Sequence, residues 1–137
     1  MADDLKLIPI GYVRSSLADR SAAPKQAHEH APGARIEILP EFAQAAGQIR
    51  TGDELWLLTW LHQSRRSTLV VHPRSDQRNP LTGVFSTRSP DRPNPIGLHR
   101  VTVTAAGAGW IEVVHLEAID GTPVLDIKPV LENRNTA

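Results

Sequence analysis

A chain of 137 residues without cysteine fits a single domain and excludes both a disulfide framework and a thiolate metal site. The formal net charge is zero, but residues 63–100 contain seven arginines, two aspartates and no lysine, a local charge of +5. The N-terminus lacks the basic and apolar regions of a signal peptide, and the longest apolar run, Leu55 to Leu61, is far below the ~20 residues of a membrane helix. We therefore expect a soluble, cytoplasmic protein that makes no contact with membranes.

Short apolar segments that contain β-formers and are separated by turn residues predict β-strands. In chain order, the expected strands are residues 7–13, 34–39, 55–61, 69–72, 82–86, 99–105, 110–119 and 124–127. The segments 99–105 and 110–119 alternate apolar and polar residues, which is typical of strands with one wet face. The Ala-Gly-Ala-Gly sequence at residues 106–109 predicts the hairpin turn that joins them.

One short, peripheral helix is expected at residues 40–49, where Pro40 can occupy the first turn and good helix formers follow it. Many strands with so little helix indicate an all-β fold, a small closed or nearly closed β-barrel. We expect residues 1–131 to form this single domain and residues 132–137 to be a frayed tail.

The segment from Gly83 to Leu98, GVFSTRSPDRPNPIGL, is the most informative part of the chain. Ser89, Arg92 and Asn94 each precede a proline, whose ring keeps the preceding residue out of the α region. The segment should therefore be an extended, stiff loop that holds Arg88, Arg92 and Asn94 ready to donate hydrogen bonds to a ligand. Arginine without lysine favours recognition of a carboxylate or phosphate. A loop that merely closes one end of the barrel is the alternative.

Three further features have structural explanations that we favour. The His-Glu-His sequence at residues 28–30 lacks a third and a fourth ligand, so we expect a surface feature and no metal site. The glycines at residues 107–109 do not form a dinucleotide-binding fingerprint. Trp56, Trp60 and Trp110 lie in apolar strands and are expected in the core, although Trp60 could approach an adenine.

Five blocks, in order, resemble the TsaA-like (YaeB-like) family, which includes the bacterial enzyme that methylates threonylcarbamoyladenosine in tRNA. The blocks are residues 10–15 (IGYVRS), 23–26 (APKQ), 55–63 (LWLLTWLHQ), the segment 83–98, and 120–129 (DGTPVLDIKP). The resemblance implies a β-barrel that pairs as a homodimer and binds S-adenosylmethionine near the interface. It also implies methyl transfer to the exocyclic nitrogen of threonylcarbamoyladenosine in tRNA, or to a related small molecule.

The resemblance implies a set of cofactor-binding residues, carried over position by position. They are Pro24, Lys25, Gln26, His62, Gln63, Arg88, Leu98, Leu116, Glu117 and Ala118. Within this set, Arg88 or Lys25 could bind the carboxylate of S-adenosylmethionine. The amides of Gln26 and Gln63 can both donate and accept hydrogen bonds at the adenine. The leucines would supply apolar walls.

The closing block contains the candidates for handling the methyl acceptor, Asp120, Asp126 and Lys128, to none of which we assign a catalytic role. Asp120 also has an alternative interpretation as part of a simple turn. The tRNA-modifying members of the family continue with a second region, whereas this chain ends eight residues after Pro129. Two alternatives therefore stay open: a non-catalytic module that binds S-adenosylmethionine or a nucleotide, and an RNA-binding barrel without enzymatic activity.

Overall fold

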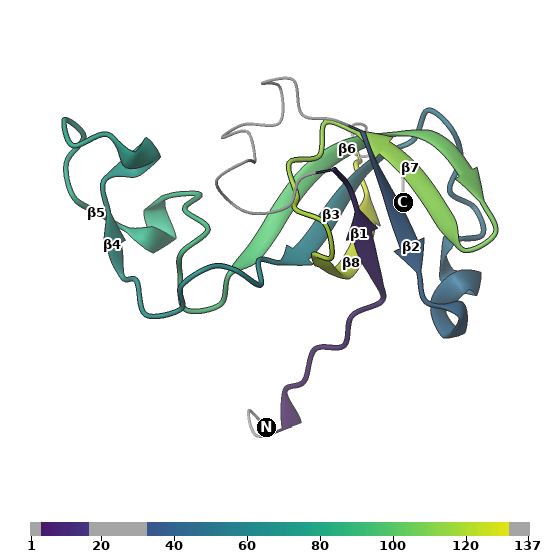
Figure 1. Ribbon diagram of the computed structural model, residues 1–137, viewed down its shortest axis with the longest axis horizontal. Helices are drawn as coiled ribbons and strands as arrows, with labels where there is room; N and C mark the ends of the chain where they lie inside the picture. Colours follow the sequence, from purple (N-terminus) through teal and green to yellow (C-terminus); the bar gives the residue numbers. More distant parts are fainter. Residues whose placement is uncertain (1–3, 17–32, 132–137) are drawn as a thin grey trace.

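Six antiparallel strands close into a barrel in the computed structural model, which describes residues 4–16 and 33–131. Their order is β1-β2-β7-β6-β3-β8, and β8 pairs back to β1 (Figure 1). The bounds are β1 Gly11–Arg14, β2 Ala34–Ile38, β3 Glu54–Trp60, β6 Ile96–Gly107, β7 Trp110–Val114 and β8 Pro123–Pro129. The predicted all-β barrel is confirmed. Its extent, residues 1–131, stays a prediction, and the tail at 132–137 lies outside the described residues.

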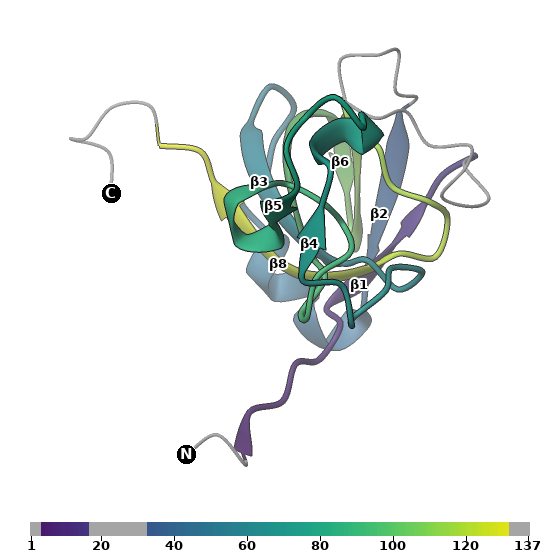
Figure 2. The ribbon, with the colours of Figure 1, turned by 90° about the vertical axis from the view of Figure 1, so that its left-hand side faces the viewer.

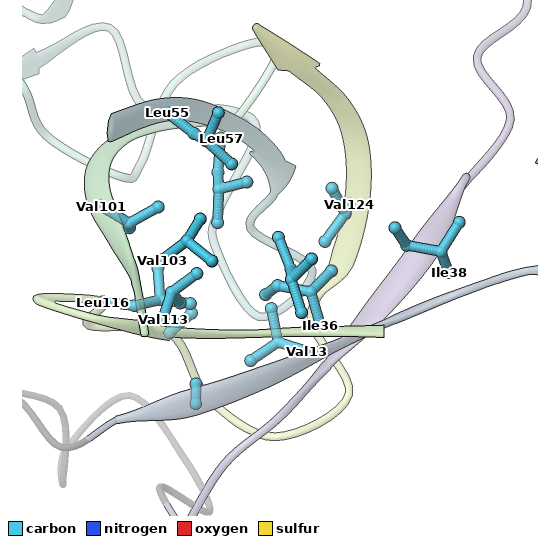
Figure 3. Close-up of a cluster of buried hydrophobic side chains, with 13 residues drawn as sticks. Val13, Ile36, Ile38, Leu55, Leu57, Val101, Val103, Val113, Leu116 and Val124 are labelled. Atoms are coloured by element: carbon cyan, nitrogen blue, oxygen red, sulfur yellow. The ribbon is translucent and has the colours of Figure 1, made fainter. Parts of the chain in front are cut away.

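The hydrophobic core fills the inside of the barrel. Alternate residues of each strand point inward, as the period of two requires, and converge in Figure 3. The buried cluster comprises Val13, Ala34, Ile36, Ile38, Leu55, Leu57, Val101, Val103, Ile111, Val113, Leu116, Ala118 and Val124. Since burying one valine, leucine or isoleucine contributes about 1.5–3 kcal/mol, this cluster is the main source of stability.

Several strand bounds differ from the predicted ones. β7 ends at Val114 and does not reach residue 119, because His115 adopts a positive φ of 69° that interrupts an extended strand. The predicted strand at 82–86 is reduced to β5, Thr82–Gly83, and continues as the 3-10 helix η5, Val84–Ser86. The strand at 69–72 is reduced to β4, Val70–Val71, which pairs with β5 in a separate sheet.

The predicted helix at residues 40–49 is a 3-10 helix, η3, which spans Pro40–Ala46. Pro40 occupies its first turn, as expected. Phe42, Ala46 and Ile49 pack against the buried cluster, so η3 and the residues after it cover one end of the barrel. We call this the helix end.

A lobe made of residues 61–95 projects from the other end of the barrel, between β3 and β6 (Figures 1 and 2). It contains β4, β5, η5 and the 3-10 helix η4, Pro73–Ser75. The backbone N–H of Leu61 donates to the carbonyl of Pro95 at 2.8 Å, so the two ends of the lobe meet. We call this part of the barrel the lobe end. No helix among the described residues is both long and apolar enough to cross a membrane.

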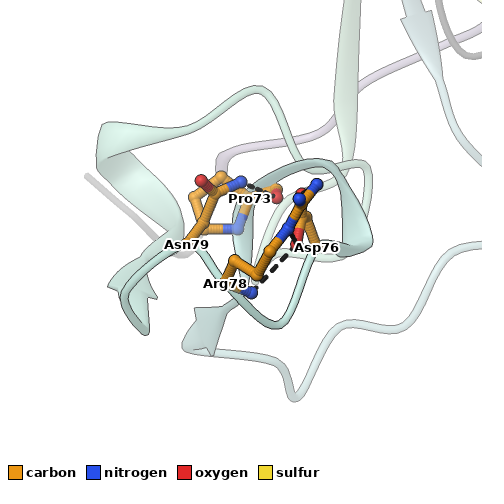
Figure 4. A network of polar contacts seen from close by, with 4 residues as sticks. All are labelled: Pro73, Asp76, Arg78 and Asn79. Carbon is orange, nitrogen blue, oxygen red and sulfur yellow. Dashed lines mark hydrogen bonds and ion pairs between the residues drawn. The ribbon is translucent and has the colours of Figure 1, made fainter.

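The tip of the lobe is held by its own polar contacts (Figure 4). The side chain of Asn79 donates to the carbonyl of Pro73 at 2.8 Å, and the Arg78 guanidinium contacts the Asp76 carboxylate at 2.8 Å. These hydrogen bonds from Arg78 lower the pKa of Asp76 below its ordinary value. The charge of Arg78 is therefore already balanced within the tip.

Candidate functional site

The described segments that the resemblance assigned to cofactor binding lie at the lobe end of the barrel or in the lobe itself. β1, β3 and β7 run toward this end, while β2, β6 and β8 start from it, because all neighbouring strands are antiparallel. Exposed His62 and Gln63 directly follow β3, Leu98 lies near the start of β6, and residues 116–118 follow β7. The candidate residues Pro24, Lys25 and Gln26 and the His-Glu-His sequence at 28–30 lie outside the described residues.

The strand register brings two predicted site residues into one row on the outside of the barrel. Leu58 of β3 lies opposite Leu98 of β6 on one side and opposite Asp126 of β8 on the other. The side chain of Asp126 forms an ion pair of 3.0 Å with Lys128, and both side chains are about half exposed. Leu98 is 44% exposed. Two apolar side chains, Leu58 and Leu98, therefore lie in one row with the carboxylate of Asp126 on the outside of the barrel.

The three tryptophans lie outside the barrel, so the prediction that they belong to the core was wrong. Each has the guanidinium of an arginine over its ring. The pairs are Trp110 with Arg35, Trp60 with Arg66 and Trp56 with Arg100, at 4.2, 5.1 and 5.9 Å from the ring centroids. These stacked arginines cover part of each ring, and the pair at Trp60 lies at the lobe end.

Arg92 organises the loop of the segment 83–98, and its role differs from the predicted one of donating to a ligand. Its guanidinium donates to three carbonyls of its own loop, those of Val84 and Thr87 at 2.6 Å and that of Ser89 at 2.8 Å. The Asn94 side chain accepts a hydrogen bond from Arg66 at 3.0 Å. The Arg92 guanidinium is therefore not a ready donor for a ligand, and that interpretation is corrected. The bond from Arg66 uses only the amide oxygen of Asn94, so its amide nitrogen stays a predicted donor. The segment also contains η5, so it is not extended throughout.

Arg88 is the other arginine of this loop and stays a predicted ligand-binding residue. Its side chain is exposed, and within the described part of the chain the structure records no ion pair for it. The backbone on either side is fixed, since the Thr87 hydroxyl donates to the Val84 carbonyl and accepts from the N–H of Ser89. The arrangement presents one guanidinium from a rigid loop, which is what recognition of a carboxylate requires.

Residues 116–118, which follow β7, place two of their three side chains in the hydrophobic core. The side chains of Leu116 and Ala118 are 1% and 4% exposed and belong to the buried cluster. A wall formed by the Leu116 side chain is therefore incompatible with its position. The backbone of this segment and Glu117, which is only partly buried, stay predicted contacts of the cofactor.

Asp120 has a structural role that the sequence left open. Its carboxylate accepts a hydrogen bond from the backbone N–H of Ser15 at 3.1 Å, and Gly121 next to it adopts a φ of +83°. The turn therefore joins the end of β1 to the start of β8, as expected for an Asp-Gly turn. No group of three or more histidine, aspartate or glutamate side chains within residues 4–16 and 33–131 is placed to hold a metal ion.

A polar pair inside the barrel was not anticipated. The hydroxyl of Thr59 lies 2.8 Å from Nε2 of His99, and burial lowers the pKa of His99 to about 4. The sequence offered one signal, a histidine in phase with the inward-facing Val101 and Val103, but a period of two cannot decide which phase is buried.

The chain is similar to known proteins over almost its whole length. A family model described as the tRNA-methyltransferase O N-terminal domain matches residues 12–135. A probable S-adenosyl-L-methionine-binding protein of Methanothermobacter thermautotrophicus is 39% identical over 130 residues, which cover 95% of this chain and 93% of that protein. The putative S-adenosylmethionine-dependent methyltransferase RcsF of Pseudomonas aeruginosa is 40% identical over 127 residues, 88% of this chain and 54% of that protein.

Solved structures show the same fold. A crystal structure of TrmO superposes with a TM-score of 0.75 at 33% identity, and one of TrmO from Pseudomonas aeruginosa with 0.73 at 34%. Each covers 97% of this chain, whereas this chain spans 58% and 59% of those proteins. The resemblance drawn from the five sequence blocks is thereby confirmed, and the chain belongs to the family of tRNA-methyltransferase O N-terminal domains.

Proposed function

We propose that this chain binds S-adenosylmethionine at the lobe end and transfers its methyl group to threonylcarbamoyladenosine in tRNA. The observation that carries the proposal is that His62, Gln63 and Leu98 lie at one end of the barrel, from which the lobe that contains Arg88 projects. The names of the relatives, which describe S-adenosylmethionine binding and methyl transfer, support it. Such a reaction belongs in the cytoplasm, where tRNA is available.

The residues present suit the chemistry of this cofactor. When bound, S-adenosylmethionine supplies a methyl group activated by a sulfonium centre. The Arg88 guanidinium can bind the amino-acid carboxylate, the Gln63 amide can meet the adenine edge, and exposed Leu98 can contact the ligand's apolar parts. The protein's share of catalysis is to align the acceptor nitrogen with the methyl group, and Asp126 is the candidate for holding the departing proton.

The charge of the lobe supports a nucleic acid as the larger substrate. Residues 61–95 contain six arginines and two aspartates, a charge of +4, so the remainder of the chain sums to −4. The positive part is the lobe that carries Arg88, and it joins β3 to β6, the strands that contribute Leu58 and Leu98 to the row with Asp126. Phosphates would therefore be attracted to the end of the barrel at which the cofactor is proposed to bind.

The function is tested by incubating the purified chain with methyl-labelled S-adenosylmethionine and tRNA from a strain that lacks the corresponding gene. Label in the tRNA, at threonylcarbamoyladenosine, is the expected result. Calorimetric binding of the cofactor without any transfer would favour the non-catalytic module instead. A flat titration at high micromolar cofactor would contradict both.

Replacing Arg88 by alanine is expected to weaken S-adenosylmethionine binding by about 1.5–3 kcal/mol, a tenfold to hundredfold rise in Kd, because a charged hydrogen bond to the carboxylate is lost. Calorimetric titration measures the change. Arg78→Ala is the matched control, since Arg78 is an exposed lobe arginine already paired with Asp76. An equal Kd for Arg88→Ala and the wild type would assign the carboxylate to another group, with Lys25 next in line.

The second part of the proposal is a homodimer formed through the lobe. Four apolar side chains there, Leu69, Val70, Leu81 and Phe85, are 51–82% exposed. A sheet of two strands is marginally stable by itself, so a lobe built on β4 and β5 gains from a partner. A second copy presents the same apolar surface, which suits a two-fold interface.

Phe85→Ser is expected to shift the chain toward the monomer, because the most exposed of these side chains is lost. Sedimentation velocity across a concentration series measures the shift. Leu5→Ser serves as the control, since Leu5 is 78% exposed but lies in the segment before β1. Monomers in the wild type, or an equal effect of both substitutions, would speak against a lobe-mediated dimer.

A further inference from the structure

The side chains inside the barrel are apolar except near its lobe end, where a polar pair lies among them. Thr59 is completely buried, and its hydroxyl forms a hydrogen bond with His99. Both side chains point inward, because they continue the inward series of Leu55 and Leu57 on β3 and of Val101 on β6. Taking two polar groups out of water costs free energy that an apolar pair would not. Stability alone therefore does not explain this pair.

The hydrogen bond runs diagonally between the two strands. In the β3–β6 register, Thr59 lies opposite Gly97, and His99 lies opposite Leu57. Gly97 provides the necessary space, since a Cβ at this position would collide with the Thr59 hydroxyl and lie 2.7 Å from Nε2 of His99. The backbone of Gly97 has no positive φ, so glycine is needed here for room and not for conformation.

The other edge of β3 is irregular at the same residue. The β3–β8 ladder pairs Leu58 with Asp126 and then Thr59 with Val124, so Leu125 is left without a partner on β3. A bulge of this kind disrupts the local ladder. Pairing with β8 therefore holds the last residues of β3 less firmly, and the Thr59–His99 hydrogen bond adds a tether on the β6 side.

We propose that Thr59, His99 and Gly97 form a positioning unit, which fixes the end of β3 against the start of β6 and so holds the cofactor-binding segments in place. Residues 62–63 follow β3 directly, and Leu98 lies between the two β6 members of the unit. The inference rests on the proposed function, because it concerns the segments that would bind S-adenosylmethionine.

Two substitutions of Thr59 separate the hydroxyl from the shape of the side chain. Thr59→Val preserves the shape and removes the hydroxyl, while Thr59→Ser preserves the hydroxyl. Calorimetry on the full chain is expected to show a Kd for S-adenosylmethionine about tenfold higher for Thr59→Val and within about twofold of the wild type for Thr59→Ser. Val101→Ala is the matched control: it removes buried atoms from the same inner face of β6, so it should lower the unfolding midpoint in urea and leave Kd unchanged.

An unchanged Kd for Thr59→Val, or a serine variant that binds no better than the valine variant, overturns the inference. If the wild type binds no S-adenosylmethionine, the proposed function fails, and amide hydrogen exchange of the unliganded protein decides the inference. Faster exchange at residues 61–63 and 96–98 in Thr59→Val than in Thr59→Ser supports it, and equal exchange overturns it. Should Thr59→Val not fold, His99→Leu removes the same hydrogen bond from the other side and is read in the same way.

Discussion

Replacement of Arg92 by methionine should weaken S-adenosylmethionine binding at least tenfold, although Arg92 is not expected to touch the cofactor. Its guanidinium donates to the carbonyls of Val84, Thr87 and Ser89, and a charged hydrogen bond typically contributes ~1.5–3 kcal/mol. Losing all three at a partly buried site should destabilise the loop by about 3 kcal/mol, since such losses do not add fully. Arg88, four residues earlier, would then lose its fixed position.

Amide hydrogen exchange measures the loop, and calorimetry measures the affinity. Arg92→Lys separates geometry from charge, because lysine keeps the charge but has no planar fork that reaches three carbonyls. We expect the lysine variant to exchange and bind like the methionine variant. A lysine variant that binds like the wild type would show that the charge near Arg88, and not the hydrogen-bond network, matters.

Acidification should destabilise the wild type more than a His99→Gln variant. Burial lowers the pKa of His99 in the folded protein from 6.5 to about 4. Between these values the unfolded chain binds a proton that the folded chain does not, so stability falls as the pH falls through this window. A shift of this size corresponds to about 3 kcal/mol, fully lost below pH 4.

Urea unfolding of both proteins at several pH values between 7 and 4 measures this effect. Glutamine does not titrate but can still form a hydrogen bond with Thr59, so other groups cancel in the difference between the two curves. The difference should change by about 3 kcal/mol against the wild type over this range. A difference that stays constant with pH would mean that His99 is not buried in its neutral form.

Most of the barrel could be predicted from the sequence, because the alternation in residues 99–105 and 110–114 matches strands with one buried face. The orientation of β3 could not. Leu55 and Leu57 face the inside, whereas Trp56 and Leu58 face the outside, and both sets are apolar. When both faces of a strand carry apolar side chains, alternation does not distinguish the core from an exposed surface.

The sequence was sufficient to predict which segments belong to the candidate site, but not what each residue does in it. Those segments that lie within the described residues are at one end of the barrel or in the lobe that projects from it, because strand direction determines the end at which each connection lies. The role of Arg92 depends on η5, which turns the carbonyls of Val84 and Thr87 toward the same guanidinium. The burial of Leu116 likewise depends on the turn at His115. The contacts of Arg92 and the burial of Leu116 arise from tertiary structure, so no local sequence pattern predicts them.

The lobe, residues 61–95, is an insertion between two paired strands of the barrel. β3 and β6 are paired neighbours that a short hairpin turn could connect, and the hydrogen bond from Leu61 to Pro95 joins the first and last residues of the lobe. Lengthening a closed loop costs little additional entropy, about 0.6 kcal/mol for each doubling. The length and charge of the lobe can therefore vary while the barrel that anchors it keeps its register.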